Sequence, residues 1–212
     1  MNMGQKAVVL LSSGLDSTVN LYRACQDLDV VLALTFDYGQ KAASQEIAYS
    51  RKHCEKLGVS HKVVELPWLS QISQSALVSS FSEVPLGDQV KVDDYNTSLN
   101  TAQKVWVSNR NGVFLNIAAA FAEGLKADYV IPGFNKEEAQ TFPDNSDEFL
   151  RIMEKSFSFS TQNKVQTKCF TIHMDKRAIA QMGRELNVPF EWIWPCYLGG
   201  ARPCGACESC QR

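Results

Sequence analysis

Four of the 7 cysteines in the chain are crowded near its C-terminal end. They form a C-x7-C step followed by two C-x2-C steps: Cys196, Cys204, Cys207 and Cys210. A C-x2-C step lets one tight turn present two thiolates to the same ion, and four thiolates complete a tetrahedral shell. The spacing therefore predicts a structural metal site. We expect one Zn²⁺ per chain, with an iron–sulfur cluster as the alternative.

A second group of polar residues follows the apolar run that begins at Ala7. This run has no polar alternation, which predicts a strand buried on both faces, and it ends in a serine-rich turn before a helical pattern. At such a turn, the backbone N–H groups and the helix dipole favour an anion. Asp16 beside a phosphate makes sense if Mg²⁺ lies between them. The predicted anion-binding turn comprises Leu11, Ser12, Ser13, Gly14, Leu15, Asp16, Ser17 and Thr18.

The same turn has a simpler interpretation as an ordinary capped helix, because Ser and Asp are favoured at helix N-termini in any case. A short serine-glycine turn does not by itself decide between the two interpretations.

The composition limits the function classes. With 212 residues, of which 45% are hydrophobic, the chain can bury one full core. The net charge of −2 argues against a nucleic-acid duplex or a membrane surface as a partner. The N-terminal apolar run spans five residues, too few for a secretion signal or a membrane span, so we expect a cytoplasmic protein.

Apolar runs alternate along the chain with segments of helical periodicity. This alternation predicts the α/β class with an open, doubly wound parallel sheet, whose ligands bind at the carboxyl ends of the strands. Residues 69–104 are rich in Ser, Gln, Asp and Asn and are predicted to form a long loop. The predicted strands begin at residue 7 and cover 30–36, 62–66, 128–134 and 165–172, and the predicted helices cover about 15–27, 41–57, 112–125, 147–155 and 175–186.

The anion-binding turn has a family resemblance. Its pattern Ser-x-Gly-x-Asp-Ser resembles the S-G-G-x-D-S signature of the PP-loop ATP pyrophosphatases, with Ser13 in the place of the first glycine. No lysine follows Gly14 as it would in a Walker motif. The resemblance implies a Rossmann-like PP-loop domain over residues 1–190, with a zinc-binding segment over 191–212 packed on it. It also implies that ATP is cleaved to AMP and pyrophosphate.

With the four-cysteine segment on the same chain, the resemblance narrows to the 7-cyano-7-deazaguanine synthases of the queuosine pathway and covers nearly the whole chain. Further matches are the segment 35–40, the pair Arg110-Asn111, Gly133, and the run 142–144. Two segments depart from the family's usual V-P-G-R-N and S-G-Y-P-D-C-R, namely 107–111 and 140–146. The reaction class of the family can therefore be expected of this chain more safely than the family's substrate contacts.

The resemblance implies roles for the matching residues. Asp16 and Arg110 would be catalytic, and the turn would bind ATP together with Phe36, Tyr38 and Gln40. The residues implied to bind the substrate are Arg110, Asn111, Gly133, Phe142 and Asp144.

The chemistry implied by the family converts 7-carboxy-7-deazaguanine and ammonia into the nitrile at the expense of ATP, with Mg²⁺ and structural Zn²⁺, in a homodimer. The carboxylate would be adenylated, amidated and then dehydrated. Two alternatives are a PP-loop tRNA-modifying enzyme of the thiolation type and a non-catalytic zinc-knuckle module that binds nucleotides. Thiolation would require a reactive cysteine pair and a basic RNA-binding surface.

Three charged residues are interpreted from their local context. Arg110 could be an ordinary surface arginine, but an arginine at a helix N-terminus is electrostatically unfavourable, which favours an anionic ligand there. Glu137 and Glu138 are predicted to form a solvated loop face, as most charge pairs do.

Overall fold

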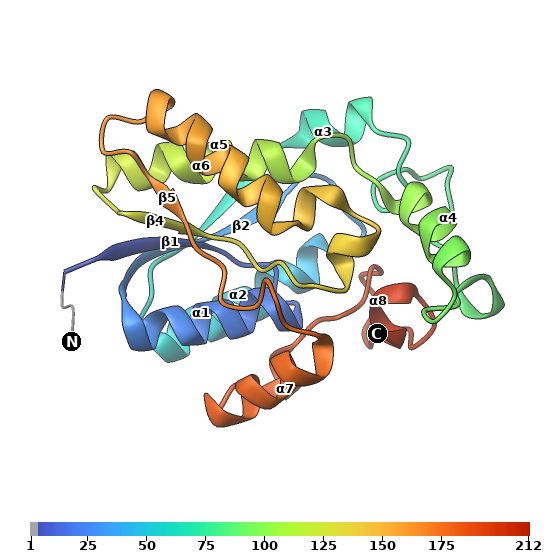
Figure 1. Ribbon diagram of the computed structural model, residues 1–212. Helices are drawn as coiled ribbons and strands as arrows, with labels where there is room; N and C mark the ends of the chain where they lie inside the picture. The colour runs from blue at the N-terminus through green and yellow to red at the C-terminus, as the bar shows by residue number, and fades with distance from the viewer. Residues whose placement is uncertain (1–3) are drawn as a thin grey trace.

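The computed structural model describes residues 4–212 and contains one parallel sheet of five strands in the order β3-β2-β1-β4-β5 (Figure 1). The strands are β1 (Lys6–Leu10), β2 (Asp29–Asp37), β3 (His61–Glu65), β4 (Tyr129–Ile131) and β5 (Gln166–Thr167). The predicted open, doubly wound parallel sheet is confirmed. Because the strand order reverses between β1 and β4, a ligand is expected at the carboxyl ends of these two strands.

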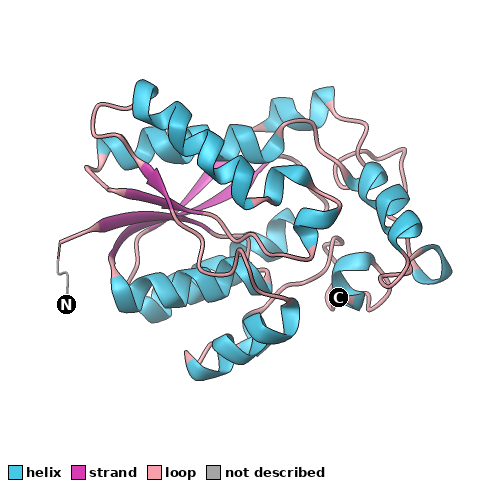
Figure 2. Cartoon of the chain, in the orientation of Figure 1, coloured by secondary structure: helices cyan, strands magenta, loops and turns pink. Residues whose placement is uncertain are grey.

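Helices cover both faces of the sheet (Figures 1 and 2). On one face lie α1 (Leu15–Asp27), α2 (Ala43–Leu57) and α7 (Lys176–Glu185), and on the other lie α5 (Arg110–Gly124) and α6 (Asp147–Ser160). The remaining helices are α3 (Pro67–Ile72), α4 (Tyr95–Val105) and the short α8 (Glu208–Gln211). α8 lies beside α4, where Thr101 Oγ1 donates to Glu208 Oε2 at 2.9 Å.

The central strand β1 shows why the sequence forms this architecture. Ala7 and Val9 are fully buried in the hydrophobic cluster that includes Leu21 of α1. Val8 points the other way and is fully buried with Leu115 of α5. A strand that is covered on both faces must be apolar at every position, which explains its run of hydrophobic residues.

The prediction of an uninterrupted loop over 69–104 is wrong, because α4 occupies its last part and α3 extends into its first residues. In α4, Asp94 caps the helix by accepting from the Thr97 N–H at 2.7 Å. The buried positions of α4 follow helical spacing, but half of them are polar, so the segment shows weak apolar periodicity. They are Ser98, Thr101, Ala102 and Val105.

Other boundaries differ by a few residues. The strands predicted at 128–134 and 165–172 shorten to β4 and β5, because β5 is an edge strand that pairs with β4 over two residues. α6 continues to Ser160 because Phe157, which is fully buried, extends its apolar face. Within residues 4–212, no helix combines the length and the apolarity needed to cross a bilayer. The division into two segments at residue 190 stays a prediction.

Candidate active site

The predicted anion-binding turn links β1 to α1 at the switch point of the sheet. Ser17 Oγ accepts from the Ser12 N–H at 3.2 Å and donates to the Gly14 carbonyl at 3.2 Å, which folds the turn onto the first turn of the helix. Gly14 occupies the N-cap position and has no side chain with which to cap α1. The N–H groups at the helix start therefore lie where an anion could accept their hydrogen bonds.

Ser13 has a left-handed backbone conformation, with φ of 56°. This is the position at which the PP-loop signature has glycine, and a serine here costs about 1 kcal/mol relative to glycine. The fully buried Ser13 is held by two hydrogen bonds. Its Oγ donates to the Ser12 carbonyl at 2.6 Å, and its own carbonyl accepts from the Trp194 N–H at 2.9 Å.

Gly133 lies against the first turn of α1. A Cβ atom at this position would be 2.4 Å from the backbone nitrogen of Ser17 and 2.5 Å from its Cα. Any larger side chain at this position would clash with the anion-binding turn, which explains why the residue is glycine. A substrate contact at Gly133 stays a prediction.

A methyl group at Gly133 should therefore displace the turn. We expect Gly133→Ala to lower the free energy of unfolding by about 1–3 kcal/mol and to reduce ATP turnover, because the added Cβ meets backbone atoms. Gly124→Ala is the matched control, since a Cβ there meets nothing within 4 Å. Chemical denaturation and a turnover assay would check both variants, and equal behaviour of the two would contradict this explanation.

Asp16 forms the centre of a charged cluster. Its Oδ2 accepts from Lys176 Nζ at 2.6 Å and from Asn135 Nδ2 at 3.1 Å. Its buried Oδ1 has no hydrogen-bond partner within residues 4–212. Burial raises the pKa of Asp16 to about 6, and the charge of Glu138 adds to the increase while Lys176 opposes it. Asp16 is thus ionised at neutral pH at a desolvation cost.

The prediction that Glu137 and Glu138 form a solvated face is wrong. Glu138 pairs with Lys176 Nζ at 2.7 Å, and Glu137 accepts from the Lys176 N–H at 2.9 Å. The reason is local, because Asn135 Oδ1 accepts from the N–H groups of both glutamates and folds the loop onto the start of α7. Glu137 also pairs with Arg212 at 3.7 Å.

Lys176 is a member of this charged cluster that the sequence interpretation missed. It is the first residue of α7, where a cation is electrostatically unfavourable unless it has a partner. The same argument, applied above to Arg110, could have identified it. Burial acts to lower the pKa of Lys176, but Glu138 and Asp16 together raise it well above its usual value.

Arg110 begins α5, which covers the face of the sheet opposite α1. Its Nη1 donates to Tyr38 Oη at 3.1 Å, and its guanidinium carbon lies 5.8 Å from the centre of the Tyr38 ring. Burial acts to lower the pKa of Arg110, but Tyr38 and Asp144 raise it further than burial lowers it. The guanidinium thus stays charged. A guanidinium has five N–H donors, so the contact with Tyr38 leaves donors for an anionic ligand.

Three residues predicted to bind the nucleotide lie at the end of β2 or directly after it, and β2 is the strand that pairs with β1. Phe36 stacks on Phe114 with ring centres 4.0 Å apart. Gln40 organises the loop, since its Oε1 accepts from the Tyr38 N–H and its Nε2 donates to the Phe36 carbonyl, each at 2.9 Å. Contacts of Phe36, Tyr38 and Gln40 with a nucleotide stay predictions. Leu11 and Leu15 pack into hydrophobic clusters, so they would offer a nucleotide mainly their backbone groups.

Three of the predicted substrate residues come together near the start of α5, namely Arg110, Asn111 and Asp144, whereas Gly133 packs against α1. Asn111 Nδ2 donates to the Asp144 carbonyl at 3.4 Å. Phe142 stacks on Trp106, with ring centres 6.2 Å apart and planes inclined by 5°. Burial raises the pKa of the Asp144 carboxyl, against the opposing charge of Arg110. The roles of these residues in binding a substrate stay predictions.

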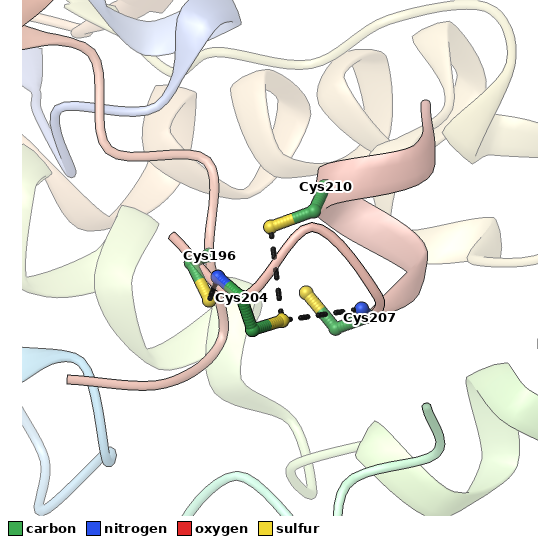
Figure 3. Close-up of side chains that lie close together, drawn as sticks. All are labelled: Cys196, Cys204, Cys207 and Cys210. Atoms are coloured by element: carbon green, nitrogen blue, oxygen red, sulfur yellow. Dashed lines mark hydrogen bonds between the residues drawn. The ribbon is translucent and has the colours of Figure 1, made fainter. Parts of the chain in front are cut away.

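The four C-terminal cysteines converge, and their thiols point toward one another (Figure 3). Their sulfur atoms all lie within 4.8 Å of one another, and a tetrahedral ion with bonds of about 2.3 Å requires sulfur atoms about 3.8 Å apart. Cys196 Sγ accepts from two backbone N–H groups at 3.3 Å, and Gly205, with φ of 68°, permits the tight turn that follows Cys204. The four cysteines could hold a metal ion.

Comparison with known proteins agrees with this geometry. The family model described as "Queuosine biosynthesis protein QueC" matches residues 6–212. The chain belongs to this family. A relative from Bdellovibrio bacteriovorus, named 7-cyano-7-deazaguanine synthase, is 54% identical over 100% of this chain and 92% of its own length. A protein of the same name from Methanosarcina barkeri is 46% identical over 98% of this chain and 91% of its own length.

Two solved structures of low sequence identity share the fold alone. A predicted subunit of tRNA methyltransferase from Methanocaldococcus jannaschii superposes with a TM-score of 0.52 at 14% identity, over 85% of this chain and 75% of that one. NMN synthetase from Francisella tularensis superposes with a TM-score of 0.50 at 15% identity, over 96% of this chain and 71% of that one.

Proposed function

We propose that this protein is a 7-cyano-7-deazaguanine synthase, which uses ATP to convert 7-carboxy-7-deazaguanine and ammonia into the nitrile. The observation that carries the proposal is the full-length match to proteins of that name. The site supports it, because the anion-binding turn and the charged, half-buried Arg110 lie at the carboxyl edge of one sheet. The turn would hold the triphosphate of ATP, and Arg110 would hold the carboxylate of the acid substrate.

The chemistry follows from the leaving group. A carboxylate does not react with ammonia because oxide is a poor leaving group, and adenylation replaces it with AMP. The protein has to aim the carboxylate at the α-phosphorus and neutralise charge. The N–H groups of the turn would hold phosphate oxygens, Arg110 would orient the carboxylate, and Lys176 would supply positive charge beside Asp16.

Asp16 fits a site for Mg²⁺, because its carboxylate is the kind of ligand that this ion prefers and its Oδ1 has no partner in the described chain. When bound with ATP, Mg²⁺ would supply further neutralisation of phosphate charge. The donor set of four converging thiolates fits Zn²⁺ and makes a closed structural site the natural role.

The two alternative functions are less well supported. A thiolation enzyme needs a reactive thiolate, whereas burial raises the pKa of Cys25 to about 11 and that of Cys54 to about 12. Burial raises the pKa of the Cys169 thiol as well. A non-catalytic module would not require a charged cluster at the anion-binding turn. The homodimer, ammonia as the nitrogen donor, and the lack of a nucleic-acid partner remain predictions.

The role of Arg110 can be tested through the Michaelis constant of the acid substrate. Arg110→Gln should raise this constant by about tenfold or more, since a charge-assisted hydrogen bond contributes roughly 1.5–3 kcal/mol. Arg110→Lys keeps the charge but loses the planar fork, so its defect should be intermediate. Steady-state kinetics with the acid and with its primary amide would locate the effect. An equal defect toward both would contradict recognition of the carboxylate.

The order of the reaction gives a second test. One nitrile should consume two ATP, because both carboxylate oxygens must leave and each must be activated at the single turn. Supplying the synthetic amide should bypass the ammonia requirement and halve the ATP consumed per nitrile. Chromatographic quantification of AMP and nitrile would measure this ratio. Failure to turn over the amide would exclude the two-adenylation order.

A further inference from the structure

The metal segment, residues 196–210, sits between two contacts with the candidate active site. On its N-terminal side, the Trp194 N–H donates at 2.9 Å to the carbonyl of Ser13, the strained residue of the anion-binding turn. On its C-terminal side, Arg212 pairs with Glu137 at 3.7 Å. Each contact lies two residues from a cysteine of the cluster, namely Cys196 or Cys210. The position of the cysteine cluster is therefore tied to both flanks of the site.

Glu137, the partner of Arg212, also contacts Lys176, which reaches Asp16. Glu137 Oε1 accepts from the Lys176 N–H at 2.9 Å, at the first residue of α7. Lys176 Nζ in turn contacts Asp16 Oδ2 at 2.6 Å. One carboxylate thus binds both the arginine that follows the cysteines and the backbone of the lysine that reaches the anion-binding turn. Moving Glu137 would move the start of α7 and with it Lys176.

Arg212 is built into this position. Its side chain is 13% exposed, and it forms a second ion pair at 2.8 Å with Glu208, the first residue of the preceding helix α8. Glu208 is itself buried and accepts from Thr101 of α4. An exposed ion pair contributes little to stability. Arg212 is largely buried and paired with two glutamates, so its removal would leave their charges uncompensated.

We infer that Arg212 is a positioning residue for the adenylation reaction: through Glu137 it fixes Lys176 beside Asp16, so that the metal segment aligns the charge on which phosphate chemistry depends. The inference rests on the proposed function of the anion-binding turn. It assigns the metal segment a task beyond stability, since a displacement of a catalytic group by about 1 Å can reduce turnover by about 100-fold.

The test compares Arg212→Ala with Arg202→Ala, which removes an exposed arginine of the same segment. Arg212→Ala should retain one metal per chain by elemental analysis and bind a non-hydrolysable ATP analogue with the wild-type stoichiometry. Its kcat should fall about 10- to 100-fold with a smaller change in the KM for ATP. Arg202→Ala should match the wild type, and Arg212→Lys should recover part of the loss.

Two further variants separate positioning from general damage to the segment. Glu137→Gln lies outside the segment, so it should reproduce the kcat defect with full metal content, and adding Arg212→Ala to it should change kcat by less than about twofold. In a Lys176→Met background, Arg212→Ala should likewise have no additional effect. Wild-type kcat in Arg212→Ala with full metal content, or additive losses in either double variant, would overturn the inference. An inactive wild type would instead refute the proposed function.

Discussion

Asp16→Asn is expected to reduce ATP turnover by about 100- to 1000-fold, the loss typical when one electrostatic contribution to a transition state is removed. The fold should survive the change. Burial raises the pKa of Asp16 to about 6, so its ionised form at neutral pH is less favourable in the folded chain than in the unfolded chain. A neutral amide of the same shape removes that cost and leaves Lys176 paired with Glu138.

The measurements for this variant are turnover of ATP to AMP and circular dichroism through thermal unfolding. Asp29→Asn is the control, because this exposed carboxylate lies at the start of β2, at the amino end of the sheet. Wild-type turnover in Asp16→Asn, together with a normal unfolding curve, would remove Asp16 from the proposed site.

Cys207→Ser is expected to release the metal and to lower the free energy of unfolding by several kcal/mol. Metal-binding energy is folding energy when the site does not exist in the unfolded chain. Cys207 is fully buried, and its backbone pairs with Leu86, so the loss should loosen this contact as well. Elemental analysis should find one zinc per wild-type chain and much less in the variant.

Cys54→Ser provides the matched control, since Cys54 is equally buried but lies in α2, away from the cluster. It should retain the metal and lose only the stability expected for a hydroxyl in an apolar site. Stoichiometric iron with acid-labile sulfide in the wild type, or unchanged zinc content in Cys207→Ser, would contradict the zinc assignment.

The parts of the site that sequence patterns predicted are those formed by local chemistry. The turn after β1 and the cysteine cluster each lie within one short segment, so their spacing alone restricts the geometry. Ser13 has a left-handed φ, the conformation that glycine adopts most readily and that fits the glycine of the signature at this position. The argument for Arg110 is equally local, because a cation at a helix N-terminus needs an explanation, and its role stays a prediction.

The parts that sequence patterns missed depend on tertiary contacts. Lys176 and Glu138 are separated from Asp16 by more than a hundred residues, and no local period marks them as neighbours. Glu137 resembles a surface residue until the fold places the start of α7 and Arg212 against it. In α4 half of the buried residues are polar, so the apolar residues of this segment show no clear helical period.

The central claim is that the turn at the switch point cleaves ATP to AMP and pyrophosphate in order to activate a deazapurine carboxylate. The most direct measurement is a quenched chromatographic assay of the purified chain with ATP, Mg²⁺ and ammonium, with and without 7-carboxy-7-deazaguanine. We expect AMP and pyrophosphate to form only when the acid is present, together with the nitrile. Accumulation of ADP, or AMP formation that does not depend on the acid, would contradict the claim.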